Sequence, residues 1–218
     1  MAHSHDEHDH VHAHDEHELH HVHEHENTEV EDLDDEAPRL DPETVARRRA
    51  ALSFIRQWGD PVLKTRATEV RHFDESLRAQ VQRMGGLMND ALGVGLAAPQ
   101  VGISQRLLVY RVGHEAPLIA LINPVIEWVS KKDQEIAEEG CLSLQNVAVD
   151  VERPVHVRVR AVDEFGEERL VEASGLEARV IQHEMDHLDG TLILDRTSRD
   201  QRKRAMRALR EGEAASAA

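Results

Sequence analysis

The chain has 218 residues and a formal net charge of −16, and residues 1–36 hold fourteen of its Asp and Glu residues, eleven of its sixteen His and no Lys or Arg. No apolar run approaches the roughly 20 residues that cross a bilayer, and no export signal is recognisable, so we expect a cytoplasmic protein without membrane contact. A single cysteine excludes an intramolecular disulfide, and the residues that follow the acidic segment suffice for one sizeable core.

Residues 1–36 are a low-complexity segment in which His alternates with acidic residues. Large apolar groups are too few there to offset the entropy lost on ordering, so we predict a disordered tail. The alternating His and carboxylates could bind divalent metals loosely, or the segment could be only a solvated acidic tail. Residues 37–52 are predicted to be a linker or an N-terminal helical extension.

Two helices are predicted in the first half of the chain. The first, at 41–57, has Asp41 as its N-cap and Pro42 in its first turn, and its run of three arginines is expected to be solvated. The second, at 74–92, carries apolar residues at spacings of three and four, which is typical of one buried helix face.

The second half of the chain groups its predicted strands together rather than alternating them with helices. The strands are expected at 106–112, 118–129, 155–162 and 167–173. A helix is predicted at 174–188, with Ser174 as N-cap and Glu177 as its capping-box partner. This grouping favours an α+β fold, in which antiparallel β-sheets pack around a central metal-binding helix and a C-terminal helix follows.

The segment GVGLAAPQVG, which begins at Gly93, combines small residues with one polar side chain, that of Gln100. Small residues let the backbone approach a ligand closely. No Lys-Ser or Lys-Thr pair follows, so a phosphate cradle is not favoured. An amide at the end of such a loop fits a donor to a developing oxyanion better.

Cys141 lies in the segment EEGCLSL and is the only cysteine of the chain. A lone cysteine serves either packing or chemistry. Two carboxylates and a glycine directly before it are unusual company for a core cysteine, so we interpret Cys141 as a chemical residue.

The segment QHEMDHLDG places His183 and His187 four residues apart, with Glu184 beside the first. Residues at i and i+4 share one helix face, so both imidazoles can bind one metal ion while the carboxylate reaches a water on that ion. A catalytic metal usually takes three protein ligands, and no further His follows to supply the third.

These three segments together resemble the peptide deformylase family, which is marked by the patterns GxGxAAxQ, EGCLS and HExDH in this order. Here they are Gly93–Gln100, Glu139–Ser143 and His183–His187, and every fixed position matches. The resemblance covers roughly residues 54–210. It implies a metal-dependent hydrolase that removes the formyl group from formyl-methionine of nascent polypeptides and releases formate, with metal-bound water as the nucleophile.

The resemblance also implies roles for individual residues. Cys141, His183 and His187 would hold one Fe²⁺ per chain, with Zn²⁺, Ni²⁺ or Co²⁺ as substitutes, because the spacing of the ligands alone does not select among these metals. Glu184 would act as general base. The Gln100 side-chain amide and the backbone N–H of Leu142 would stabilise the oxyanion.

A methionine side chain requires an apolar pocket, and small or apolar residues near the three motifs can form it. The expected substrate-binding residues are Val94, Gly95, Leu96, Gly140, Leu142, Val180 and Ile181. Arg179, one turn before His183, is expected at the pocket rim, where its charge conflicts with an apolar wall. The family resemblance further pairs Glu139 with Arg153 behind the cysteine. His72, His114 and His156 lack ligand spacing and are assigned to the surface.

Other functions remain open at this point. A zinc protease or another amidase could use the same helix, and a non-enzymatic metal buffer could rely on the His-rich tail. The catalytic domain is predicted at 53–212, with a disordered C-terminus at 213–218. The expected partners are a nascent formyl-methionyl polypeptide and the ribosome, which the basic segment Arg199–Arg210 would contact, with no membrane and no DNA.

Overall fold

The computed structural model of the protein describes residues 40–113 and 115–216, with side-chain exposure given as far as residue 212. Residues 1–39 and His114 lie outside the described residues. The predicted disorder of the acidic tail and the surface assignment of His114 therefore stay predictions. Within these described ranges, no helix is both long and apolar enough to cross a membrane. Residues from Leu40 onward form one compact unit.

The first helix, α1 (Pro42–Leu52), begins as its sequence predicts, because the Asp41 carboxylate accepts a hydrogen bond of 2.9 Å from the Thr44 amide. All three arginines of its run are exposed. The prediction that the helix continues to 57 is wrong. After Leu52 the chain turns through hydrogen bonds that span three residues, and the amide of Arg56 donates to the carbonyl of Gln100 instead.

The second helix, α2 (Glu75–Asp90), is also capped by an aspartate, since Asp74 accepts a hydrogen bond from the Leu77 amide. The predicted apolar face is buried and packs into a core shared with strands β1 (Gly95–Ala97) and β2 (Leu107–Tyr110). Its fully or nearly buried side chains are Leu77, Val81, Met84 and Met88. This helix leads the chain directly into the glycine-containing loop.

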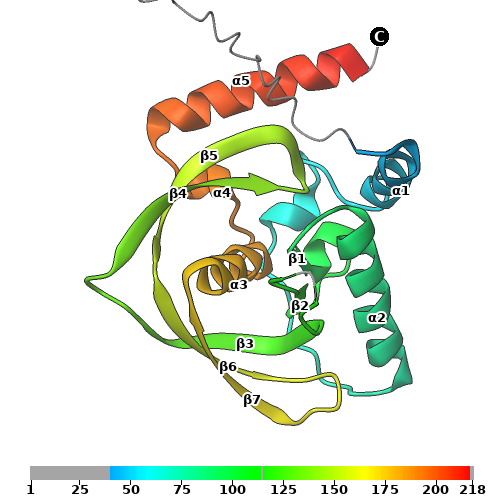
Figure 1. Ribbon diagram of the computed structural model, residues 1–218, viewed down its shortest axis with the longest axis vertical. Helices are drawn as coiled ribbons and strands as arrows, with labels where there is room; N and C mark the ends of the chain where they lie inside the picture. The colour runs from blue at the N-terminus through cyan, green and yellow to red at the C-terminus, as the bar shows by residue number, and fades with distance from the viewer. Residues whose placement is uncertain (1–39, 114, 217–218) are drawn as a thin grey trace, which may run out of the picture. The chain divides into compact units, whose positions relative to one another are not determined.

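Five strands form one antiparallel sheet in the order β1-β2-β3-β6-β7 (Figure 1). They are β1 (Gly95–Ala97), β2 (Leu107–Tyr110), β3 (Ile119–Val129), β6 (His156–Val162) and β7 (Glu168–Ser174). Four of them correspond to the predicted strands. The short β1 lies at the sheet edge, immediately before the 3₁₀ helix η2 (Ala98–Val101), which carries Gln100.

A separate two-stranded sheet, which the sequence did not predict, consists of β4 (Gln134–Cys141) and β5 (Leu144–Pro154). Most of β4 is exposed and three of its eight residues are glutamates, so its sequence lacks the apolar alternation that indicates a strand. On β5 the residues at every second position from Val147 to Arg153 are buried. The pairing register shifts between Gly140 and Cys141, which is typical of a β-bulge.

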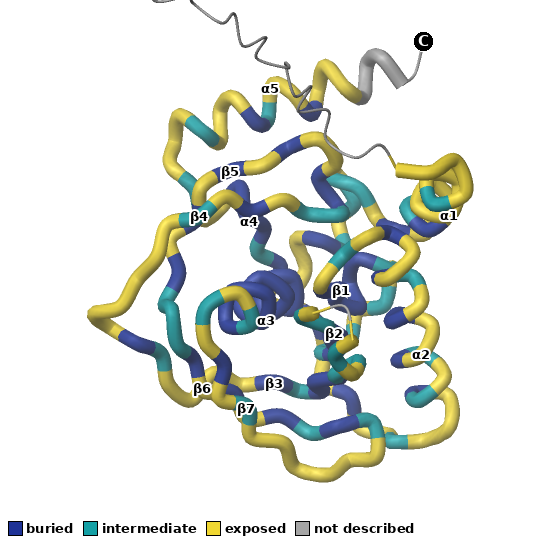
Figure 2. The backbone as a smooth tube through the Cα atoms, viewed as in Figure 1, coloured by how far each residue is buried: buried dark blue, intermediate teal, exposed yellow. Residues whose placement is uncertain are grey.

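The helix α3 (Gly175–Leu188) lies between these two sheets, and every residue from Ala178 to Leu188 is buried (Figures 1 and 2). The antiparallel sheets around one helix confirm the predicted fold class. The predicted capping box is wrong. The Ser174 side chain makes no capping hydrogen bond, and its Oγ atom lies 2.8 Å from His156 Nδ1 instead. The Glu177 carboxylate accepts a hydrogen bond from the hydroxyl of Tyr110.

Two helices complete the fold: the short α4 (Ile193–Arg196) and the long α5 (Arg199–Ser216), which continues beyond the predicted boundary at 212. Together with a 3₁₀ helix, η1 (Pro61–Lys64), they cover the two-stranded sheet. Ala205 and Leu209 anchor α5 in an apolar cluster with β5, and most of its other side chains are exposed (Figure 2).

The turn after α3 generates a test of the fold. Gly190 has φ +70°, and a Cβ there would meet the backbone of Lys64 at 2.8 Å, whereas Gly175 has φ +56° and open space around it. Gly175→Ala should cost about 1–2 kcal/mol of unfolding free energy through backbone strain alone. Gly190→Ala should cost at least about 1 kcal/mol more, because it also adds a steric clash. Urea denaturation of both variants measures the difference, and equal losses would contradict the described packing.

Candidate active site

Cys141, His183 and His187 converge at the centre of the molecule, where the end of β4 meets α3. One ligand atom from each residue lies within 4.8 Å of the others, and Cys141 Sγ is 3.3 Å from His187 Nε2. The histidines are adjacent because they are one helical turn apart. The cysteine reaches them because β4 ends there at the irregular pairing next to Gly140. The structure thus brings together the three residues that the sequence predicts as ligands.

The donor set fits a divalent transition metal. One thiol and two imidazoles are suited to tetrahedral binding of Zn²⁺, Fe²⁺ or a similar ion. Burial and the nearby charge of His183 hold the pKa of His187 well below its usual value, so this ring stays in the neutral form that binds metal. Burial alone would lower the pKa of His183, but hydrogen bonds to Cys141 and Glu139 raise it well above its usual value. A metal cation would therefore displace a proton from His183.

Glu184 is buried beside these ligands, and its Oε2 atom has no hydrogen-bond partner among the described residues. Burial raises the pKa of this carboxyl to about 7. Buried polar atoms are nearly always paired, so an unpaired carboxylate oxygen on a pocket wall is typical of a functional group. Its position depends on Gly95, where a Cβ would lie only 2.8 Å from the Glu184 Cγ atom.

The Gln100 side chain is held so that its amino group faces the cysteine. Its Oε1 atom accepts a hydrogen bond of 2.8 Å from the amide of Ala97. This bond fixes the orientation of the amide, whose Nε2 donates to Ser143 Oγ at 3.3 Å and lies 3.7 Å from Cys141 Sγ. The short helix η2 thus places an N–H donor at the cluster. The carbonyl of Leu142 is held by Gln57 Nε2 at 3.2 Å.

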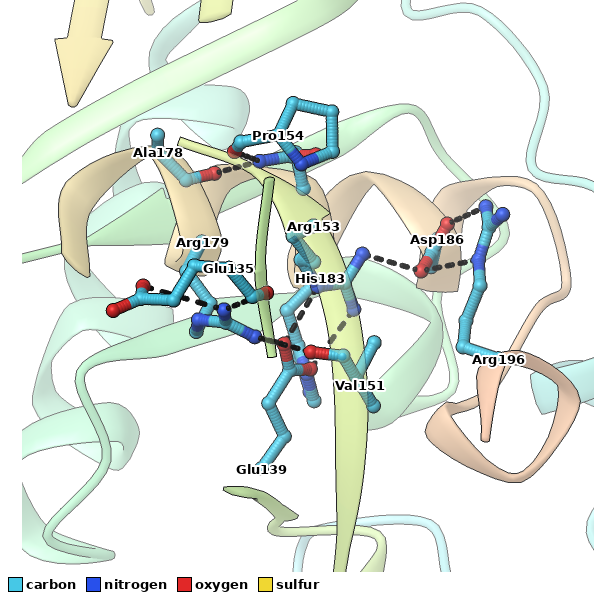
Figure 3. A network of polar contacts seen from close by, with 11 residues as sticks. Glu135, Glu139, Val151, Arg153, Pro154, Ala178, Arg179, His183, Asp186 and Arg196 are labelled. Carbon is cyan, nitrogen blue, oxygen red and sulfur yellow. Dashed lines mark hydrogen bonds and ion pairs between the residues drawn. The ribbon is translucent and has the colours of Figure 1, made fainter. Parts of the chain in front are cut away.

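A network of buried ion pairs contacts His183 on the ring edge that carries Nδ1 (Figure 3). Glu139 Oε2 is 3.0 Å from His183 Nδ1, while Arg153 binds both Glu139 oxygens, at 2.6 and 2.9 Å. Burial would raise the pKa of Glu139, but the hydrogen bonds and charges of Arg153 and His183 outweigh it and lower the pKa to about 2. The ionised carboxylate fixes Nδ1 of His183 as a donor, so its Nε2 is the atom left for a metal. The contact between Glu139 and Arg153 expected from the resemblance is present.

The network extends further than the sequence indicated (Figure 3). Arg153 also binds Asp186 at 3.0 Å, and Arg196 donates to the same carboxylate. Arg179 is largely buried and donates to Glu139 at 2.8 Å. Although Arg179 lines the pocket, its charge is neutralised there, which resolves the conflict that its sequence position raised. Asp186 lies within the HEMDH motif, but nothing in the sequence connects it with Arg196.

A pocket of about 600 Å³ opens onto Cys141, His183 and Glu184. Of the seven predicted substrate-binding residues, five line it: Val94, Gly95, Gly140, Leu142 and Val180. Leu96 and Ile181 are a correction, because both are fully buried in the two main core clusters. Leu96 alternates with Gly95 and therefore points to the opposite face of β1. Ile181 follows Val180 on the helix and therefore points in a different direction, into the core.

The pocket also has apolar lining residues that were not expected from the sequence. Leu176 lies one helical turn before Val180, and Leu92 precedes the glycine-containing loop. The i, i+4 spacing of Leu176 and Val180 could have identified the first of these, because such residues share one helix face. From α1, Arg48 and Leu52 also reach the pocket wall.

Comparison with known proteins gives consistent results. Residues 53–203 match the family model described as polypeptide deformylase. A peptide deformylase of Acidothermus cellulolyticus is 46% identical over 167 residues, which are 75% of this chain and 88% of that protein. The solved peptide deformylase of Thermotoga maritima is 49% identical, with a TM-score of 0.64 over 66% of this chain and 96% of that one. The enzyme of Synechococcus elongatus, solved in complex with actinonin, is 44% identical, with a TM-score of 0.68 over 71% and 85%.

The buried network makes a stability prediction that depends on no ligand. Arg153→Met should lower the free energy of unfolding by about 3–5 kcal/mol, because it leaves Glu139 and Asp186 without their shared buried cation. Arg158→Met removes an ion pair of the same length, 2.6 Å, with exposed Glu172, and should cost at most about 1 kcal/mol. Urea denaturation compares the two variants, and similar losses would show that the network contributes little to stability.

Proposed function

The chain belongs to the polypeptide deformylase family, and on that premise we propose that it hydrolyses the formyl amide of formyl-methionyl polypeptides at the cluster of Cys141, His183 and His187, with one bound metal ion. Membership of the family supports removal of the N-terminal formyl group from nascent peptides. The observation that carries the finer proposal is the buried Glu184 oxygen, unpartnered among the described residues, beside three convergent ligand atoms.

Cys141, His183 and His187 would hold the metal, which we propose to be Fe²⁺, with Zn²⁺, Ni²⁺ or Co²⁺ as substitutes. When bound, a divalent cation supplies Lewis acidity and lowers the pKa of a water molecule to about 7, which makes that water a nucleophile at neutral pH. A single thiolate leaves such a site with net positive charge. The metal's identity rests on the family resemblance, because this donor set accepts several ions.

Glu184 is the proposed general base. Its position beside His183, its burial and its raised pKa suit a carboxylate that takes a proton from water and later gives it up. As the water oxygen bonds to the formyl carbon, the carboxylate accepts the proton. As the carbon–nitrogen bond breaks, the proton passes to the departing amine. The products are formate and a peptide with a free methionyl amino group.

Gln100 and Leu142 are the proposed oxyanion donors. The Gln100 amino group is directed at Cys141 by the bond between its Oε1 and Ala97, so it needs no reorientation as negative charge develops on the formyl oxygen. The backbone N–H of Leu142 follows Cys141 directly along the chain. A preorganised donor of this kind typically contributes about 10²–10³ in rate.

The pocket lining fits a methionine side chain. Val94, Leu142, Val180 and Leu176 offer apolar surface, and Arg179 is paired with Glu139, so it presents no free charge to the substrate. Gly95 and Gly140 offer backbone at the ends of two edge strands, which an extended peptide could join through main-chain hydrogen bonds.

Replacement of the general base tests this function directly. In metal-loaded protein, Glu184→Gln should lower formate release from formyl-Met-Ala-Ser by at least about 10²-fold, since it removes the proton acceptor and leaves all three ligands. Metal content should be unchanged. Glu177→Gln, on the same helix but outside the pocket lining, is the matched control. Near-normal turnover by folded, metal-loaded Glu184→Gln would contradict the role of Glu184.

Nascent formylated chains emerge from ribosomes in the cytoplasm, and we propose that the enzyme acts there and contacts the ribosome through α5. Six exposed basic residues lie along this helix: Arg199, Arg202, Lys203, Arg204, Arg207 and Arg210. Arg202 and Arg207 make ion pairs with Asp195 and Glu211, and the other four make none among the described residues. Cationic side chains of this kind bind RNA phosphates in a salt-sensitive way.

The ribosome contact is tested by cosedimentation at low salt. Truncation of α5 would remove Ala205 and Leu209 from the core, so the test neutralises charge instead. Changing Arg199, Lys203 and Arg210 together to Gln should reduce binding at least about threefold, while Arg158→Gln with Arg160→Gln on β6 should not. Equal binding by all forms, or no binding of the unchanged protein, would remove this proposal and leave the peptide chemistry unaffected.

A further inference from the structure

The helix α1 contributes to the pocket although it precedes residues 53–203, the stretch that matches the family model. Arg48 and Leu52 line the same pocket as Cys141 and Glu184. Leu52 and Leu142 pack against the same apolar cluster, so α1 is anchored close to the turn that follows Cys141. The turn between β4 and β5 faces α1 (Figure 1). This pocket wall therefore belongs to the chain's own N-terminal extension.

The side chains around Arg48 are polar. Gln145 and Asn146, at the start of β5, line the pocket with Arg48, and both are exposed. Gln145 and Arg48 also line a neighbouring hollow, most of whose lining comes from α1. Arg48, Gln145 and Asn146 thus give the pocket a polar wall, in addition to the apolar lining that Leu176 and Val180 provide.

Arg48 is an available charge within this wall. It is exposed and makes no hydrogen bond or ion pair among the described residues. The other arginine in the pocket lining, Arg179, is neutralised by Glu139. The exposed carboxylate of Glu138 also lines the pocket, together with a separate hollow against α5. The pocket thus has an available cation contributed by α1 and an exposed anion contributed by β4.

We propose that Arg48, with Gln145 and Asn146, forms a subsite for the residues that follow methionine, and that it favours an acidic side chain there over a basic one. This inference rests on the proposed function. A pocket of about 600 Å³ is in the size range that takes a drug-sized ligand, which corresponds to a short peptide rather than to formyl-methionine alone. The apolar stem of Arg48 can lie along Leu52 while its guanidinium stays in solvent.

The size of the preference follows from the exposure of the charge. An exposed ion pair is weak, so discrimination between acidic and basic peptides should be about two- to fivefold. It should increase at low ionic strength, because salt screens such interactions.

The test compares kcat/KM for the C-terminal amides of formyl-Met-Ala-Glu, formyl-Met-Ala-Ser and formyl-Met-Ala-Lys, with metal-loaded full-length protein. The unchanged protein should prefer Glu to Lys at least about twofold. Arg48→Gln should bring this ratio near one, and Arg48→Glu should invert it. Arg47→Gln is the matched control, because Arg47 is an exposed neighbour on α1 that does not line the pocket.

The possible failures are distinguishable. Equal Glu-to-Lys ratios in the unchanged protein and in Arg48→Gln would overturn the subsite and leave the proposed function intact. The same change in Arg47→Gln as in Arg48→Gln would show a general effect of charge on α1 and would also overturn it. No formate release from any of the three peptides would contradict the proposed function, and the inference with it.

Discussion

One buried carboxylate, that of Glu139, connects the two-stranded sheet to the central helix. It binds Arg153 on β5 and both Arg179 and His183 on α3 (Figure 3). An unpaired buried charge is very costly, so this residue requires its cationic partners, and they hold the strand and the helix together. The same bond fixes the ring of His183. The stability of the fold and the geometry of the candidate site therefore depend on the same side chain.

Glu184, one residue after His183, differs from Glu139 in its hydrogen bonding. Glu139 has every partner it needs, whereas Glu184 Oε2 has none among the described residues. The space for it exists because Gly95 lacks a side chain. The pKa of Glu139 is lowered to about 2 by its cationic partners, whereas burial raises the pKa of Glu184 to about 7. Such separation is typical of sites in which one carboxylate is structural and the other exchanges protons.

The parts of the site that the residue pattern itself predicted are those set by local geometry, whereas the assignment of Cys141 to the two histidines came from the family resemblance. The spacing of His183 and His187 fixes their common face, and the amide of Gln100 is oriented by a bond to Ala97 three residues away. The β4–β5 hairpin was missed because its first strand is mostly exposed and lacks an alternation of apolar and polar residues. Leu96 and Ile181 were wrongly placed in the pocket lining, because both are apolar and lie next to residues that do line it, and only the direction of the side chain separates the two positions. Contacts between segments far apart in the chain, such as that of Glu139 with Arg179, left no pattern in the sequence.

Cys141, His183 and His187 are proposed to hold one metal ion beside Glu184. X-ray absorption spectroscopy on anaerobically purified protein lacking residues 1–36 tests it most directly, because removing the tail removes eleven competing His. We expect an iron edge, with a coordination shell of one sulfur and two imidazole nitrogens, and loss of the sulfur in Cys141→Ser. A shell of nitrogen and oxygen alone in the unchanged site would contradict it.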